Sequence, residues 1–498
     1  MSPQTLNELP NEILGSIFRN FCQHCRSESE PDTPHGYIRG TRQRPEDPSW
    51  YSLDCQALHS LCLTSKHIRD IAQPILYHDF MPGYGDSWRS ESYAWRERLV
   101  YFLRTIIQRP DLAALVRRIY IHPLLVKNID ETWTKNTLEP VTQGLAFPLF
   151  EYLAHFPDEG GFESDFYQHQ MLFAPLFGIL LAVLTNLSHL SLQVAPRSVP
   201  ISPSALEVAG VSKLCLKNID ISAYSNPRSD GDYRFNIDND TYGLFKLVDN
   251  IETLNLHMCC SVPNPLRVKM RALRITHSRM NKESLGNLLS YWTGLETFIY
   301  EATHPPLITY GCLSGSPMDD GIVHFQPNDA IGYLYDHRST LKTLHLDLRN
   351  WSIVGKLPQP ISILREFTAL EDLLLNQDMI CNDRRTEQHQ LTGILPPSIR
   401  KLQIIGPFRE FFHSLVKGLH GLADAASQGD FPHLRKVMCD MVNDLEGYGL
   451  GESFARAKVD FSYEAYLPSG PTILPSHMVN SPKHSEFLPV LLPEEDDL

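Results

Sequence analysis

Apolar residues near the N-terminus follow a helical period. Residues 6–21 read LNELPNEILGSIFRNF, and Pro10 suits a first helical turn because its missing N–H would have no partner there. The apolar positions recur every three to four residues, as on one face of a helix: Ile13, Leu14, Ile17, Phe18 and Phe21. The spacing predicts a short amphipathic helix.

A second helical pattern follows a polar stretch. Residues 55–72 read CQALHSLCLTSKHIRDIA, and Asp54 is suited to cap this segment as a helix. Pro74 is expected to stop or kink the helix. The stretch between the two helices, about residues 23–52, is rich in Pro, Ser, Arg and Glu and predicts a loop or a disordered insertion.

Beyond residue 100 the pattern L-x-x-L-x-L recurs along the chain. The strict copies are LSHLSL from Leu187, VSKLCL from Val211, IETLNL from Ile251, LKTLHL from Leu341 and LEDLLL from Leu370. Looser copies are VRRIYI from Val116, MRALRI from Met270, LETFIY from Leu295, IRKLQI from Ile399 and LRKVMC from Leu434. Segments before some copies look helical, as at 99–107 and 283–292. The pattern predicts one strand and one helix or irregular arm per repeat, although a non-repetitive α/β domain remains an alternative.

LPNEILGSIF together with ALHSLCLTSKHIRDIAQPILYHDF resembles the F-box motif of fungal F-box proteins. The resemblance implies a three-helix module that docks on the Skp-type adaptor of a cullin-RING (SCF-type) ubiquitin ligase, with a cullin scaffold bound through that adaptor. The connection between Phe21 and Leu53 is longer than usual for the family, but long surface insertions cost little. The resemblance implies adaptor contacts by Leu9, Pro10, Ile13, Leu14, Ile17, Leu58, Leu61, Leu63 and Lys66. An ordinary helical hairpin with inward-facing stripes is the alternative.

The remainder resembles a degenerate leucine-rich-repeat array. We expect an F-box domain at 1–80, an irregular leucine-rich-repeat-like α/β solenoid at 81–460 and a Pro-rich acidic tail at 461–498; residues 222–240 read as a long loop. Polar residues next to the Leu positions would face the concave side and contact an unknown target protein. The candidates are Gln193, Lys217, His257, Arg274, Glu301, Asp347, Asn376 and Gln403. A solvated surface without a ligand is the alternative for each of them.

Composition narrows the class of partner. The 498 residues have a formal net charge of −14, which argues against nucleic-acid binding because phosphate neutralisation needs excess Lys and Arg. The scattered cysteines suit reduced thiols and a cytoplasmic or nuclear location. The apolar segment Met171 to Leu184 is too short to span a membrane and predicts a buried helix, so we expect no membrane partner.

Motifs for catalysis are absent. The sequence has no P-loop, no G-x-G-x-x-G after a strand, no G-x-S-x-G and no H-E-x-x-H, so we expect no catalytic residue, no cofactor and no enzyme activity. Cys22 and Cys25 form a C-x-x-C pair, but four ligands are not evident even with Cys55, so we expect no metal. A scaffold protein with a structural F-box-like hairpin, and an enzyme with unfamiliar residues, remain as alternatives.

Overall fold

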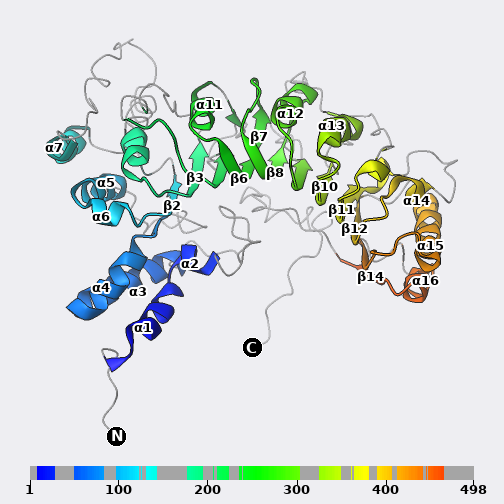
Figure 1. The fold of residues 1–498 in the computed structure, drawn as a ribbon, viewed down its shortest axis with the longest axis horizontal. Helices are drawn as coiled ribbons and strands as arrows, with labels where there is room; N and C mark the ends of the chain where they lie inside the picture. Colours follow the sequence, from blue (N-terminus) through cyan, green and yellow to red (C-terminus); the bar gives the residue numbers. More distant parts are fainter. Residues whose placement is uncertain are drawn as a thin grey trace, which may run out of the picture.

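The computed structural model of the protein is a mixed α/β fold built around a parallel sheet of 12 strands (Figure 1). The predicted α/β class is therefore confirmed. The structure describes residues 8–27, 50–82, 97–122, 125, 131–142, 176–194, 206, 210–223, 235–237, 239–302, 325–348, 361, 364–380, 390–406, 412–440, 445 and 447–464.

Four N-terminal helices form a helical module with its own small core. They are α1 (Asn11–Arg19), α2 (Gln23–Ser27), α3 (Trp50–Thr64) and α4 (Lys66–Leu76). Helices α1 and α4 are amphipathic and turn their apolar stripes toward the neighbouring helices, which buries a cluster separate from that of the sheet. The buried members of this cluster are Leu14, Phe18, Cys22, Leu58, Ile68, Ala72 and Ile75.

The segment predicted as one helix after Asp54 consists of two helices. Asp54 lies inside α3 instead of capping it, and its carboxylate forms an ion pair with Arg26. The chain breaks at Ser65, whose side chain caps α4 by accepting a hydrogen bond from the N–H of Ile68 at 3.2 Å. Pro74 lies inside α4 and does not end it. The predicted cap at Asp54 and a stop at Pro74 were therefore wrong, while a kink at Pro74 stays a prediction.

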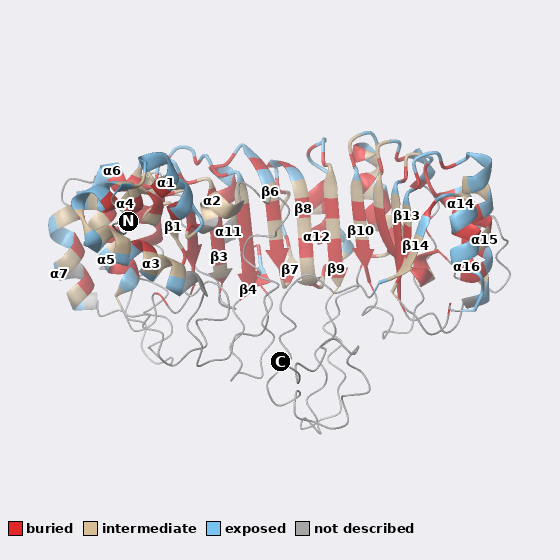
Figure 2. Cartoon of the chain, turned by 90° about the horizontal axis from the view of Figure 1, so that it is seen from below, coloured by how far each residue is buried: buried red, intermediate tan, exposed pale blue. Residues whose placement is uncertain are grey.

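The main sheet keeps the order of the chain, and every neighbouring pair of strands is parallel. Its strands are β1 (Asp79–Phe80), β2 (Arg118–Ile121), β3 (His189–Val194), β4 (Asn218–Ala223), β6 (Asn250–His257), β8 (Lys269–Ser278), β9 (Thr297–Ala302), β10 (Thr343–Asp347), β11 (Asp372–Asn376), β12 (Lys401–Ile405), β13 (Lys436–Cys439) and β14 (Asp460–Tyr463). A second sheet pairs β5 (Phe235–Asn236) with β7 (Cys259–Ser261). Figure 2 shows the main strands side by side, most of them buried.

Parallel strands require crossover connections, and the helices that form many of them lie on the outer side of a curved row of strands, while β6 and β8 are joined through β7 without a helix (Figure 1). These helices are α5 (Arg98–Gln108), α6 (Pro110–Ala113), α7 (Glu131–Thr142), α11 (Asn239–Lys246), α12 (Lys282–Leu289), α13 (Pro327–Leu334), α14 (Gln390–Ile394), α15 (Phe412–Gln428) and α16 (Leu450–Arg456), with short 3-10 turns at Tyr335–His337, Leu364–Glu366 and Gln377–Met379. Helices α5 and α12 confirm the helical predictions at 99–107 and 283–292.

Alternate strand residues point to opposite faces of the sheet, and one face is apolar. Successive Cα partners form a continuous row across this face, and every side chain in it is 0% exposed. The row consists of Leu190, Ile219, Leu254, Leu273, Phe298, Leu344, Leu373, Leu402 and Val437. These residues belong to one cluster with apolar residues of the helices, so the row is the centre of the main core.

All but one of the L-x-x-L-x-L copies coincide with strands of the main sheet. The exception is VSKLCL at 211–216, which precedes β4. The copy that fits the register is Leu216-Lys217-Asn218-Ile219-Asp220-Ile221, because Ile219 pairs with Leu190 and Ile221 with Leu192. The β-branched isoleucines suit a strand better than the Leu and Cys of the predicted copy.

Three further expectations concern loops, boundaries and membranes. The loop expected at 222–240 is interrupted by β5 and by the start of α11, and the tail expected from 461 begins inside β14. Residues 28–49 and 465–498, most of the predicted insertion and tail, lie outside the described residues.

The apolar segment Met171 to Leu184 is helical at 176–183 and buried there, as predicted. In the part of the chain that the structure describes, no helix has the length and apolarity to span a bilayer.

Candidate functional site

The helical module has two sets of apolar side chains, one in its core and one at its surface. Ile13 and Ile17 on α1 are 49% and 39% exposed, and Leu63 at the end of α3 is 74% exposed. Pro10 and Lys66, at the starts of α1 and α4, are also exposed. These five members of the predicted adaptor contact are therefore available at the surface.

Four other residues of the predicted adaptor contact lie deeper. Leu14 is 0% exposed and Leu58 is 2% exposed, and both belong to the core of the helical module. Both side chains fill the core, so they are not available at the surface of the helical module. Leu9 and Leu61 are half-buried and pack against the same core.

Leu53 is an exposed apolar residue that the sequence reading missed. It lies in the first turn of α3 and is 48% exposed. The reading placed Asp54 at the helix cap and so left Leu53 outside the helix. We call Ile13, Ile17, Leu53 and Leu63 the exposed apolar set.

The second candidate surface is the face of the sheet opposite the apolar rows. Here too the Cα partners form rows, for example Ser191, Asp220, Asn255 and Arg274. Among the predicted target contacts, Gln193 and Arg274 are half-buried on this polar face. The others on the strands are buried, namely His257, Glu301, Asp347, Asn376 and Gln403.

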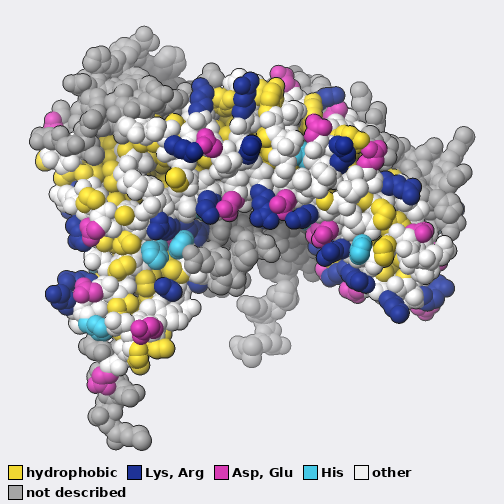
Figure 3. Space-filling view, viewed as in Figure 1, with side chains coloured by type: hydrophobic (Ala, Val, Ile, Leu, Met, Phe, Trp, Pro, Cys, Tyr) yellow, Lys and Arg dark blue, Asp and Glu magenta, His cyan; other side chains and the backbone are white. Residues whose placement is uncertain are grey.

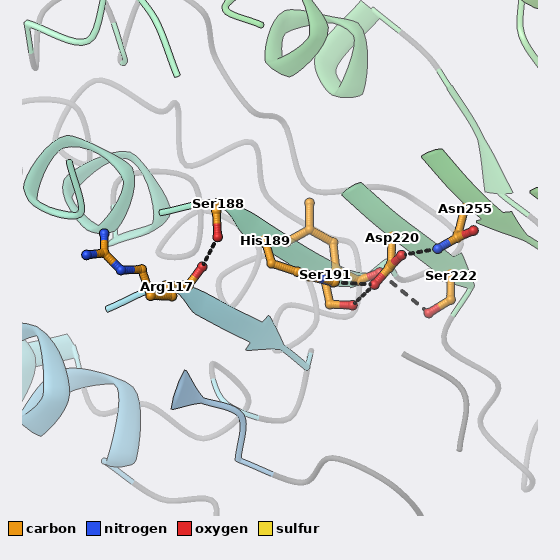
Figure 4. A network of polar contacts seen from close by, with 8 residues as sticks. Arg117, Ser188, His189, Ser191, Asp220, Ser222 and Asn255 are labelled. Carbon is orange, nitrogen blue, oxygen red and sulfur yellow. Dashed lines mark hydrogen bonds and ion pairs between the residues drawn. The ribbon is translucent and has the colours of Figure 1, made fainter. Parts of the chain in front are cut away.

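Asp220 of β4 is the centre of a buried polar network on this face (Figure 4). Its carboxylate accepts hydrogen bonds from Ser191 at 2.8 Å and Asn255 at 2.5 Å and contacts His189 Nε2 at 2.8 Å. Burial acts to raise the pKa of Asp220, but the charge of His189 and the hydrogen bonds from His189, Asn255 and Ser191 lower it overall. The network therefore holds a buried carboxylate in its charged form.

His257 of β6 lies farther along the same face and is held neutral. Its Nδ1 is 2.9 Å from the hydroxyl of Thr276, and its ring lies 5.0 Å from that of His277. Burial and the neighbouring charge of His277 lower the pKa of His257 well below its usual value. Any partner that reaches this residue would meet an uncharged imidazole.

Lys217, another predicted target contact, does not lie on the polar face. It precedes β4 at the rim of the sheet and forms an ion pair with Glu252 at 3.0 Å. The misplaced repeat copy put it after the strand instead of before it, which is why this prediction was wrong. Cys215 of the same misplaced copy is exposed.

The rim at the starts of the strands bears charges of alternating sign, and Figure 3 shows Lys or Arg side chains interspersed with Asp or Glu side chains on one face of the molecule. Arg271 and Lys342 flank Glu296 at 2.8 and 2.9 Å, and Arg400 lies 3.5 Å from Glu371. These residues occupy the second position of their L-x-x-L copies, which is the sequence signal for this rim. Because opposite charges are neighbours, the rim has no strong field of one sign.

Asp378, in the turn after β11, is a half-buried acid near the predicted contacts Asp347 and Asn376. The amide oxygen of Asn376 accepts a hydrogen bond from the N–H of Leu348 at 2.7 Å. Burial raises the pKa of Asp378 to about 6, and the charge of Asp347 adds to the rise. The folded protein therefore holds the neutral carboxyl better than the ionised one, and Asp378 destabilises the fold at pH values where it is ionised.

Replacing Asp378 with Asn is therefore expected to stabilise the protein at pH 7.5 by about 1–3 kcal/mol. The loss of folding stability caused by ionised Asp378 grows as pH rises from the pKa of the unfolded chain, about 3.9, to the higher pKa of the folded protein. The stabilisation by Asp378→Asn should therefore vanish below pH ~4. Urea unfolding at both pH values measures this. Asp430→Asn, at an exposed position, is the control, and an equal effect in both variants would contradict the assignment.

One group among the described residues could hold a metal ion, contrary to the expectation of none. It brings together Cys22, His24, Cys25 and His78. The hydrogen bond from Cys22, aided by His24 and His78, lowers the pKa of Cys25, and the same hydrogen bond raises the pKa of Cys22. The fourth member, His78, is 53 residues from Cys25, which is why motif spacing missed it.

The chain was also compared with known proteins. No protein-family model and no curated protein matched it.

Proposed function

We propose that the protein is a substrate receptor of a cullin-RING ubiquitin ligase and that its helical module is an F-box. The observation that supports this most is the exposed apolar set. A simple helical hairpin would bury its apolar stripes, yet Ile13, Ile17 and Leu63 are exposed although a second stripe already fills the core. Apolar side chains exposed at helical spacing suit a partner that packs against helices.

The motif resemblance supplies the identity of that partner. LPNEI lies at the start of α1, and LTSKHIRDIAQPILY spans the end of α3 and the whole of α4. A Skp-type adaptor would contact the exposed apolar set together with Pro10 and Lys66. Leu14 and Leu58 would support the contact from the core.

We propose further that the sheet and its outer helices form a leucine-rich-repeat-like solenoid that binds the target protein. The recurrence of L-x-x-L-x-L with strands in chain order supports this architecture. Gln193 and Arg274 are the predicted contacts on the polar face that are partly exposed. The receptor would act by proximity. Holding a target protein beside a conjugating enzyme that carries ubiquitin raises the effective concentration of the target, and this chain itself would catalyse no reaction.

Purification of the tagged protein from fungal cells tests this proposal. Wild type should bring down an adaptor and a cullin, and Ile13→Asp combined with Leu63→Asp should lose both because each change places a charge in an apolar contact. Target proteins should remain bound to the variant. Tyr291→Asp, at an exposed apolar position outside the helical module, should behave like wild type. Absence of a cullin from the wild-type complex would favour the scaffold alternative.

A further inference from the structure

Four side chains with good zinc-ligand chemistry meet at the junction of the helical module and the sheet. Cys22 precedes α2, His24 and Cys25 lie in α2, and His78 follows α4. Their ligand atoms all lie within 4.8 Å of one another. The junction therefore gathers two thiols and two imidazoles from segments on either side of α3.

The spacing of these atoms fits a tetrahedral zinc ion. The distance from Cys22 Sγ to His78 Nδ1 is 3.7 Å, and Cys25 Sγ lies 3.4 Å from the same atom. His24 Nδ1 lies 3.9 Å from Cys25 Sγ. Zn–S bonds of about 2.3 Å and Zn–N bonds of about 2.0–2.1 Å place tetrahedral ligand atoms roughly 3.3–3.8 Å apart. Small side-chain adjustments would thus be enough to enclose an ion.

Asp79, at the start of β1, contacts the four-residue group next to Cys22 and His24. Its Oδ2 accepts a hydrogen bond from the backbone N–H of His24 at 2.8 Å and lies 3.5 Å from Cys22 Sγ. Its Oδ1 is buried and has no hydrogen-bond partner among the described residues. Carboxylates that support the ligands from a second layer are common around zinc.

We propose that Cys22, His24, Cys25 and His78 bind one structural Zn²⁺ ion. Two thiolates and two neutral imidazoles favour zinc over magnesium or calcium, and four protein ligands leave no open position for catalysis. The ion would join α2 to the end of α4, one residue before β1, the first strand of the sheet. It would thereby fix the helical module against the sheet, whatever partner the module binds.

Metal analysis of the full-length protein tests the proposal. The protein would be produced with added zinc, purified in a non-chelating reductant and analysed by mass spectrometry for zinc per chain. Wild type should contain one zinc ion per chain, and Cys25→Ser with His78→Asn should lose it. Cys55→Ser with His59→Asn, which changes the same residue types on α3, should keep it. Equal zinc contents in wild type and the first variant would overturn the proposal.

Cobalt substitution keeps the test decisive if the ligand variant fails to fold. Wild type freed of zinc and loaded with Co²⁺ should show the ligand-field bands of a tetrahedral site and a sulfur-to-cobalt charge-transfer band. Its melting temperature should fall on chelation and recover with added zinc. Either of two results would refute the site. One is an octahedral cobalt spectrum without the sulfur band. The other is a reduced wild-type protein that takes up no metal, as expected if Cys22 and Cys25 serve as a redox pair instead.

Discussion

Replacing Asp220 with alanine is expected to lower the free energy of unfolding by about 3–5 kcal/mol. The substitution removes the acceptor shared by His189, Ser191 and Asn255. The side chains of Asp220 and His189 are only 4% and 6% exposed, so water cannot replace the lost partner. Equilibrium unfolding in urea, followed by circular dichroism, measures the change.

The contribution of Asp220 should depend on pH in one direction. Its folded pKa is lower than its unfolded pKa, so the stability that it contributes is present above the unfolded value. That stability should be lost as pH falls through the lower, folded value. Wild type and Asp220→Asn should therefore differ most near neutral pH and converge in acid.

A matched control separates burial from charge. Asp249 forms an exposed ion pair with Lys213, and Asp249→Ala should leave stability unchanged. If Asp220→Ala were no more destabilising than Asp249→Ala, the buried network would not support the polar face.

Replacing Leu254 with alanine is expected to lower the free energy of unfolding by about 2–5 kcal/mol. Leu254 lies in β6 at the centre of the apolar row, between Ile219 on β4 and Leu273 on β8. It is 0% exposed, so the shorter side chain leaves a cavity that its neighbours in the sheet can fill only in part. The measurement is again chemical unfolding of the full-length protein.

Glu252, two residues earlier on the same strand, provides the control for Leu254. Its side chain is 60% exposed in the charged rim, and Glu252→Ala should cost about 0–1 kcal/mol. Similar losses in the two variants would contradict the division of the strand into a core position and a rim position.

The strands were largely predictable because period-two burial leaves a direct mark on sequence. The copies IETLNL and MRALRI became β6 and β8, in which buried apolar positions alternate with less buried residues. The pattern failed at 211–216, where two overlapping copies satisfied it and only the register with β3 decides between them. It also failed at Ser65, because the apolar period continues across the break between α3 and α4.

The candidate sites were predictable only where neighbours along the chain suffice. Helical spacing placed Ile13, Leu14 and Ile17 on one broad apolar face but could not tell that Leu14 is buried while Ile13 and Ile17 are exposed. Which polar residues are buried depends on packing across strands, as for Asp220 and Ser191. His78 joins Cys22 and Cys25 only through the folded path of α3 and α4, which no local motif records.

Titration of the purified full-length protein with a purified Skp-type adaptor tests the central claim most directly. The proposed function predicts saturable one-to-one binding by wild type. It also predicts binding at least about 100-fold weaker for Ile13→Asp combined with Leu63→Asp, because two central apolar contacts are lost. Circular dichroism should show that this variant remains folded. No binding by wild type, or equal affinity of the two proteins, would contradict the claim that the exposed apolar set docks an adaptor.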